Sequence, residues 1–176
     1  MAPTRHLVVM GVAGCGKSTV GQMLADGLGW PFAEADAFHP PANIAKMSAG
    51  GALTDEDRWP WLEAIRDWIA ARDAQGTSTV VACSALRRAY RDVLREAGQV
   101  TFVHLDGRTE LIGTRLERRP HHFMPASLLP SQVHTLEPLD EGEDGVSVPI
   151  DDAPDAIARA VLDALGLQPD TGRPVE

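Results

Sequence analysis

The feature that most constrains the fold is the segment of residues 11–18, which reads Gly-Val-Ala-Gly-Cys-Gly-Lys-Ser. It matches G-x-x-x-x-G-K-[ST], the pattern of a phosphate-binding loop, or P-loop. The apolar run Leu7–Met10 precedes it and an amphipathic helical pattern follows it, as a strand–loop–helix unit requires. A chance glycine-rich turn is the alternative. Eight matched positions with the correct flanks favour a loop that binds a nucleoside triphosphate.

Each residue type in this loop has a physical role. Glycines allow several backbone N–H groups to point at a phosphate, because a Cβ would obstruct its approach. The following helix adds the positive end of its dipole. Lys17 supplies a charge for the β- and γ-phosphates, and Ser18 offers an oxygen to Mg²⁺. The predicted nucleotide-binding residues are Gly11, Val12, Ala13, Gly14, Cys15, Gly16, Lys17, Ser18 and Thr19.

The length and charge of the chain narrow its class. A length of 176 residues suits one domain, which we place at residues 1–167, and we expect a polar, disordered tail at 168–176. The net charge of −9 argues against a nucleic acid or an anionic membrane as partner. Two cysteines without metal-site spacing, and no apolar run of membrane-spanning length, predict a cytoplasmic protein.

Apolar runs alternate with helical patterns along the chain, which is typical of a parallel α/β sheet with helices on both faces. The predicted strands are Leu7–Met10, Phe32–Ala35, Thr79–Cys83, Thr101–Leu105 and Val146–Ile150. The predicted helices are Lys17–Gly27, Asp55–Arg72, Arg87–Ala97, Thr109–Arg118 and Pro154–Leu165. We therefore expect an α/β fold with a parallel five-stranded sheet.

Two stretches interrupt this alternation. Residues 38–54 are rich in proline and glycine, and Pro60 lies too deep for one straight helix, so we expect a kink or a new helix beginning there. Residues 118–145 hold four prolines and an acidic run. This second stretch is too long for an ordinary connection, which predicts a lid at about residues 118–135.

Ligands of open α/β sheets bind at the carboxyl ends of the strands, where this chain places two carboxylates. Glu34 and Asp36 are two residues apart and share one side of a strand end. One can bind Mg²⁺, directly or through water, and the other can accept the proton of an attacking hydroxyl. A turn or capping role for Asp36 and a solvated edge position for Glu34 are the alternatives.

Two arginines lie at the entrance to the expected lid. Arg115 and Arg119 are four residues apart and share one helix face. Two guanidinium groups on one face can clamp phosphate oxygens and stabilise charge that develops during phosphoryl transfer. A solvated basic face is the alternative.

Several blocks outside the P-loop resemble the bacterial-type gluconokinase family and occur in the family's order. The most specific are His39-Pro40 with Asn43 and Lys46-Met47, and Asp57-Arg58 with Pro60-Trp61-Leu62. No general requirement of nucleotide binding explains these blocks. Residues 83–92 and 122–137 fit the family as well.

The resemblance implies ATP- and Mg²⁺-dependent phosphorylation of D-gluconate, a small-molecule substrate, at its 6-hydroxyl. It also implies a P-loop fold of the nucleoside-monophosphate-kinase type with a lid. The implied catalytic residues are Lys17, Asp36, Arg115 and Arg119, and the implied metal ligands are Ser18 and Glu34. The implied substrate-side residues are Asp36, His39, Arg58, Arg87, Arg91 and His122. The family often has Asp at position 34, so the longer Glu34 could contact the metal through water.

Alternatives to this interpretation stay open. A shikimate-kinase-like enzyme also phosphorylates a hydroxylated carboxylate, whereas a non-catalytic nucleotide-binding module predicts damage at Lys17, Ser18 or Asp36, all of which are intact. His39 could be a turn histidine, and Arg58 a structural partner of the acidic residues before it. A homodimer is possible.

Overall fold

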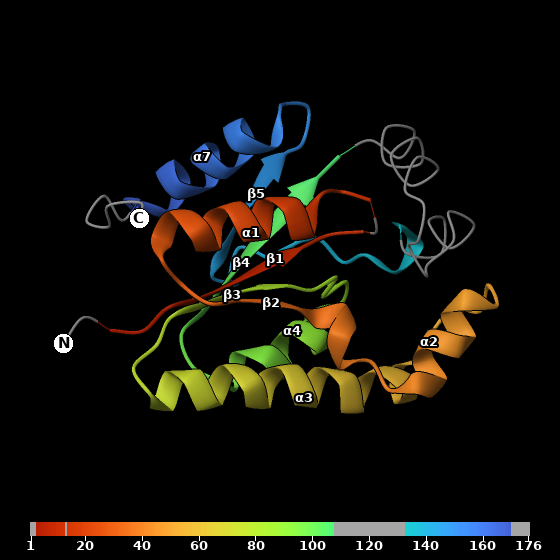
Figure 1. Cartoon of the computed structure of the whole chain (residues 1–176). Coiled ribbons are helices and arrows are strands. Elements are labelled where there is room, and N and C mark those ends of the chain that lie inside the picture. The colour runs from red at the N-terminus through yellow and green to blue at the C-terminus, as the bar shows by residue number, and fades with distance from the viewer. Residues whose placement is uncertain (1–2, 13, 108–132, 170–176) are drawn as a thin grey trace.

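A computed structural model describes residues 3–12, 14–107 and 133–169 of the chain. In this part, five parallel strands form one sheet in the order β2-β3-β1-β4-β5 (Figure 1). The strands are β1 (His6–Met10), β2 (Phe32–Glu34), β3 (Thr79–Ala82), β4 (Val100–Asp106) and β5 (Gly145–Pro149). Each bound lies within one residue of its predicted position, so the predicted sheet is confirmed.

Helices cover both faces of the sheet (Figure 1). One layer holds α1 (Lys17–Leu28) and α7 (Pro154–Leu165), and the other holds α3 (Asp55–Ala74) and α4 (Arg88–Arg95). Leu7 and Val9 of β1 pack into the first layer, whereas Val8 and Met10 pack into the second. The strand is apolar throughout because both of its faces are buried.

Helix α3 runs without interruption from Asp55 to Ala74 and contains Pro60. Of the two expected outcomes, a new helix beginning at Pro60 is therefore wrong, whereas a kink at this residue stays a prediction. A capping box between Thr54 and Asp57 fixes the first turn, with Thr54 N–H donating to the Asp57 carboxylate at 2.8 Å. The buried apolar face that begins at Trp61 offsets the one backbone hydrogen bond that a proline removes.

The first irregular stretch contains regular structure that the sequence did not predict. A 3₁₀ turn, η1 (Ala35–Phe38), follows β2, and helix α2 (Pro41–Ser48) follows the turn. Pro41 occupies the first turn of α2, where its fixed φ suits a helix and its missing N–H costs nothing. Helix α2 lies beyond the carboxyl end of the sheet (Figure 1), where the site residues gather.

The helix predicted at residues 109–118 and most of the predicted lid fall outside the described residues, as does most of the predicted tail. Among the helices that the structure describes, none has the length and apolar character needed to cross a membrane.

Candidate active site

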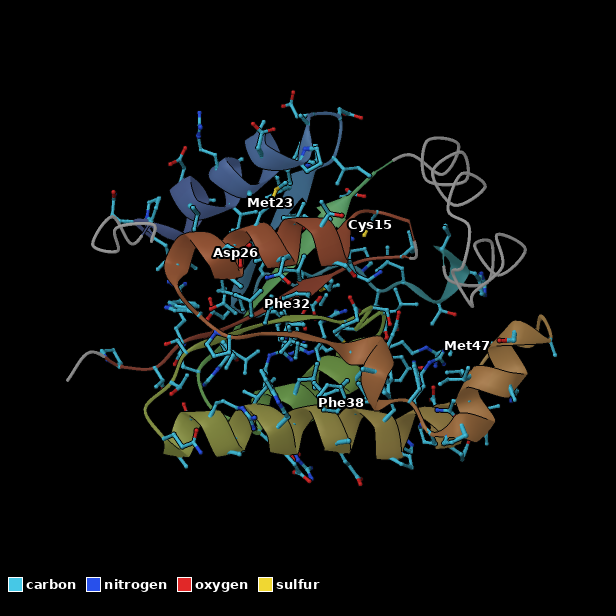
Figure 2. All side chains as sticks on the ribbon, viewed as in Figure 1. Cys15, Met23, Asp26, Phe32, Phe38 and Met47 are labelled. Atoms are coloured by element: carbon cyan, nitrogen blue, oxygen red, sulfur yellow. The ribbon has the colours of Figure 1, made fainter. Side chains whose placement is uncertain are left out.

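The loop between β1 and α1 has the backbone conformation that its glycines predict. Gly11 has φ +145°, and a Cβ there would lie 2.7 Å from Cys15 Sγ and 2.9 Å from the Leu105 carbonyl oxygen. Gly16 has φ +97° immediately before α1, in the left-handed region. Figure 2 shows Cys15 where the loop enters α1. These positions require glycine, which explains their place in the motif.

Lys17 lies over its own loop. Its Nζ donates to the carbonyl oxygen of Val12 at 3.1 Å. The ammonium group therefore stays at the mouth of the loop, where the loop's N–H groups and the α1 N-terminus also favour negative charge.

The two predicted metal ligands meet in the structure. The hydroxyl of Ser18 donates a hydrogen bond to Glu34 Oε2. Burial raises the pKa of Glu34, the Asp36 charge adds to this effect, and the Ser18 hydrogen bond opposes it. A cation at this position would favour the ionised carboxylate.

These oxygens fit Mg²⁺. P-loop sites hold this ion through one or two protein oxygens together with the phosphates of the nucleotide, not through a cage of protein ligands. No cluster of three or more His, Cys, Asp or Glu side chains that could hold a metal occurs among the described residues. Ser18 and Glu34 are thus suited to a metal that binds with the nucleotide.

Asp36 and His39 lie beside this pair, on and directly after η1. His39 Nε2 is 3.9 Å from Asp36 Oδ1. The imidazole is buried and stacks on the indole of Trp61, with ring centroids 4.2 Å apart. Burial lowers the pKa of His39 to about 4, so the ring is neutral near pH 7.

Two arginines converge on one carboxylate where α3 and α4 begin. Arg58 Nη1 donates to the Tyr90 hydroxyl at 2.9 Å and lies 3.9 Å from Asp55 Oδ1. Arg87 Nη1 lies 3.5 Å from Asp55 Oδ2, and the Tyr90 hydroxyl donates to Asp55. Burial and the neighbouring Asp55 raise the pKa of Tyr90 to about 12, which keeps its hydroxyl protonated. Arg58 and Arg87 thus contribute two positive charges, and Asp55 contributes one negative charge.

The prediction that Arg91 contacts the substrate finds no support in this geometry. Its side chain is fully buried, its Nε and Nη2 donate to Glu143 at 2.8 and 3.1 Å, and its Nη1 donates to the Ala85 carbonyl at 2.9 Å. Arg91 lies on the buried face of α4, whereas Arg87 precedes the helix and is partly exposed. We therefore exclude Arg91 from the substrate side.

The sequence did not reveal that Tyr90 holds Arg58 and Asp55. Tyr90 is the only tyrosine of the chain and lies in a strongly basic segment. This position could have indicated that its hydroxyl contacts an arginine. Ala13, Arg115, Arg119 and His122 fall outside the described residues, so their predicted roles stay predictions.

A hollow lies on the other side of the loop from Asp36, between the beginnings of α1 and α7. Residues Gly14, Cys15, Gly16, Thr19, Val20, Pro154 and Ile157 line it. Because β2 and β5 are opposite edges of the sheet, the carboxylates after β2 and this hollow flank the P-loop from two sides. Such an arrangement can hold two substrates that meet at the loop.

Comparison with known proteins identifies the class first. The family model described as shikimate kinase matches residues 13–138. The fold and the P-loop agree with this match, and the chain is a P-loop kinase.

More similar relatives identify the family. A gluconokinase of Gluconobacter oxydans (strain 621H) is 49% identical over 159 residues, which cover 90% of this chain and 89% of that protein. The structure of a gluconokinase from Sinorhizobium meliloti 1021 is 47% identical, with a TM-score of 0.83 over 93% of this chain and 92% of that one. A sugar kinase from Janibacter sp. HTCC2649 is 52% identical, with a TM-score of 0.90 over 94% and 96%. The chain belongs to the gluconokinase family.

Proposed function

We propose that the protein transfers the γ-phosphoryl group of ATP to the 6-hydroxyl of D-gluconate, giving 6-phospho-D-gluconate and ADP. The observation that carries this proposal is the position of Asp36, two residues after the Glu34 that accepts a hydrogen bond from Ser18 of the P-loop, with Arg58 and Arg87 meeting at Asp55. The chain thus offers a carboxylate that can accept a proton next to the phosphate loop, and cations that can bind a carboxylate. The gluconokinases among the relatives supply the acceptor, since gluconate carries both a hydroxyl and a carboxylate.

The nucleotide side consists of the P-loop and the hollow next to it. The loop N–H groups and Lys17 bind the β- and γ-phosphates, and the nucleobase occupies the hollow between α1 and α7. Ser18 and Glu34 would hold Mg²⁺, which would supply positive charge to neutralise the phosphates of the nucleotide. Lys17 then stabilises the charge that develops on the transferred group.

The acceptor side consists of η1 and the beginnings of α3 and α4. Asp36 accepts the proton of the 6-hydroxyl while the oxygen attacks phosphorus and ADP leaves. Arg58 and Arg87 bind the gluconate carboxylate, and a planar guanidinium suits this group because it can donate two parallel hydrogen bonds. Tyr90 and Asp55 hold the two guanidinium groups in place.

A coupled ADP-release assay tests this proposal. The acceptors are gluconate, idonate, glucose, shikimate and none, each with ATP or GTP and with or without Mg²⁺. We expect Mg²⁺-dependent turnover with ATP and gluconate, and ³¹P–¹H coupling in the product that places phosphate on carbon 6. Faster turnover with shikimate would favour a shikimate-kinase-like enzyme. ADP release that no acceptor increases would contradict the proposal.

A further inference from the structure

The orientation of the Asn43 amide follows from its contacts. Asn43 lies on the buried face of α2, and its Nδ2 donates to the backbone carbonyl of Asp57 at 2.8 Å. A carbonyl oxygen only accepts hydrogen bonds, so the amide atom that faces it is the nitrogen. The same Nδ2 lies 3.3 Å from Nδ1 of His39.

This orientation determines which nitrogen of His39 carries the proton. The Asn43 amide nitrogen has two hydrogens and no acceptor capacity, so His39 Nδ1 must accept the second one. A neutral imidazole then carries its proton on Nε2. The low pKa of His39, about 4, agrees with a neutral ring. Nε2 is the atom that faces Asp36 Oδ1.

The surrounding contacts hold both groups in place. His39 stacks on Trp61, whose Nε1 donates to the Ala35 carbonyl at 2.8 Å. Asp57, whose carbonyl binds Asn43, is fixed by the capping box of α3 and by Lys46 Nζ at 2.7 Å. The His39 ring therefore has a set plane, and its Nδ1 has a set donor.

We propose that Asn43 is a positioning residue that keeps the proton of His39 on Nε2, so that this N–H and Asp36 Oδ1 together bind the reacting hydroxyl of the acceptor. The distance of 3.9 Å between Nε2 and Oδ1 is too long for a direct hydrogen bond. A separation of 3.9 Å allows one oxygen to lie at about 2.8 Å from both atoms. A hydroxyl matches this pair because it both donates and accepts.

His39 and Asp36 also orient the hydroxyl for attack. The hydroxyl hydrogen points to Asp36, and one lone pair of the hydroxyl oxygen accepts a hydrogen bond from His39. The second lone pair of this oxygen is then left to attack phosphorus. His39 thus contacts the substrate, and Asn43 acts through His39. This inference rests on the proposed function for the identity of the hydroxyl, but the proton position of His39 does not depend on it.

The direct test is a long-range ¹H–¹⁵N spectrum of protein labelled at histidine, with the His39 signals assigned by their loss in His39→Gln. We expect the Nε2–H tautomer in the unmutated protein. In Asn43→Asp the carboxylate accepts instead of donating, so the proton should move to Nδ1 or the ring should become doubly protonated. An Nδ1–H tautomer in the unmutated protein would overturn the proposal.

The kinetic test compares two substitutions of His39. In His39→Gln the side-chain NH₂ lies near the former Nε2, whereas in His39→Asn it lies near the former Nδ1. We expect His39→Gln to keep kcat with gluconate within about tenfold and His39→Asn to lose on the order of 10²-fold, the scale of one oriented donor. The KM for ATP should stay unchanged in both variants, and circular dichroism checks that both fold.

The outcomes separate the two proposals. Equal loss of kcat in both His39 variants would show that ring shape, not a donor at Nε2, is what matters, and would overturn the pairing with Asp36. If the unmutated protein does not turn over gluconate, the proposed function fails, while the tautomer measurement still decides the role of Asn43.

Discussion

Arg91 and Glu143 form a buried ion pair that joins α4 to the segment before β5. Nε of Arg91 lies 2.8 Å from Oε1 of Glu143, and each side chain is at most 1% exposed. Arg95 also donates to Glu143, and the backbone N–H of Asp140 donates to its Oε2 at 2.8 Å. The pair is separated by 52 residues in the sequence, so it closes a large part of the fold.

Removing one partner of this pair should destabilise the protein strongly. Glu143→Ala leaves Arg91 buried and unpaired, and we expect the free energy of unfolding to fall by about 3–5 kcal/mol. Replacing both, as Arg91→Met with Glu143→Leu, should cost far less. Urea denaturation measures each value. Glu96→Ala, which breaks the exposed pair with Arg66, is the matched control and should change stability by less than about 1 kcal/mol.

The same carboxylate should make stability depend on pH. Burial alone would raise the pKa of Glu143, but hydrogen bonds from Arg91 and Arg95 outweigh it and lower the pKa to about 2 from 4.5. A carboxyl group whose pKa is lower in the folded state binds fewer protons there, so its contribution is present above pH 4.5 and is lost as the pH falls towards 2. Thermal unfolding between pH 2 and 6 should show a smaller decline in Glu143→Gln than in the unmutated protein.

Lys17→Ala should leave the fold intact and remove the charge that we propose stabilises the transferring phosphoryl group. We expect kcat to fall by roughly 10²–10³-fold. Steady-state kinetics with ATP and gluconate measure the change, and Arg66→Ala on α3, which breaks the pair with Glu96, controls for loss of a cation elsewhere. An unchanged kcat would contradict the assigned role of the P-loop lysine.

Asp36→Asn keeps the shape of the side chain and removes its charge and its capacity to accept a proton. We expect kcat to fall steeply, by at least about 10²-fold, with little change in ATP affinity. Single-turnover kinetics and ATP titration separate the two effects. Weaker ATP binding with preserved turnover would instead assign Asp36 to the metal.

Arg58→Lys and Arg58→Ala should reduce kcat/KM for gluconate and narrow the difference between gluconate and glucose. A site that leaves a cation unpaired rejects the neutral sugar, so loss of the cation removes part of that discrimination. Arg87→Ala should act in the same direction. Arg88→Ala, which breaks the exposed pair with Asp140, is the control and should keep the unmutated ratio. If Arg58→Ala keeps the unmutated ratio of kcat/KM between gluconate and glucose, Arg58 is only a structural partner of Asp55 and Tyr90.

The sheet could be predicted because each strand is a short apolar run, and burial on both faces requires that pattern. Helix α2 could not, since its proline and the glycines after it are also typical of loops. The continuity of α3 through Pro60 could not be predicted from the sequence either. It depends on packing by residues that follow the proline, and local rules do not include that packing.

The features of the site also divide into those that the sequence could predict and those that it could not. The P-loop and the approach of Ser18 to Glu34 follow from a linear motif and from the rule that strand ends meet. The difference between Arg87 and Arg91 depends on where α4 begins, because a shift of one turn places one arginine at the helix start and the other in the core. No local pattern could predict the pairing of Arg91 with Glu143, because the two residues are 52 positions apart in the sequence.

The burial of both cysteines has a practical consequence for spectroscopy. Cys15 is a buried residue of the phosphate loop, and burial raises the pKa of the Cys83 thiol to about 12. The folded protein therefore presents no reactive thiolate from Cys83 and little accessible sulfur from Cys15, since thiolate and access govern thiol labelling. A cysteine introduced at Ile44, on the exposed face of α2, would carry a maleimide fluorophore with little background. One dye at that position would report how α2 responds as each proposed substrate is added.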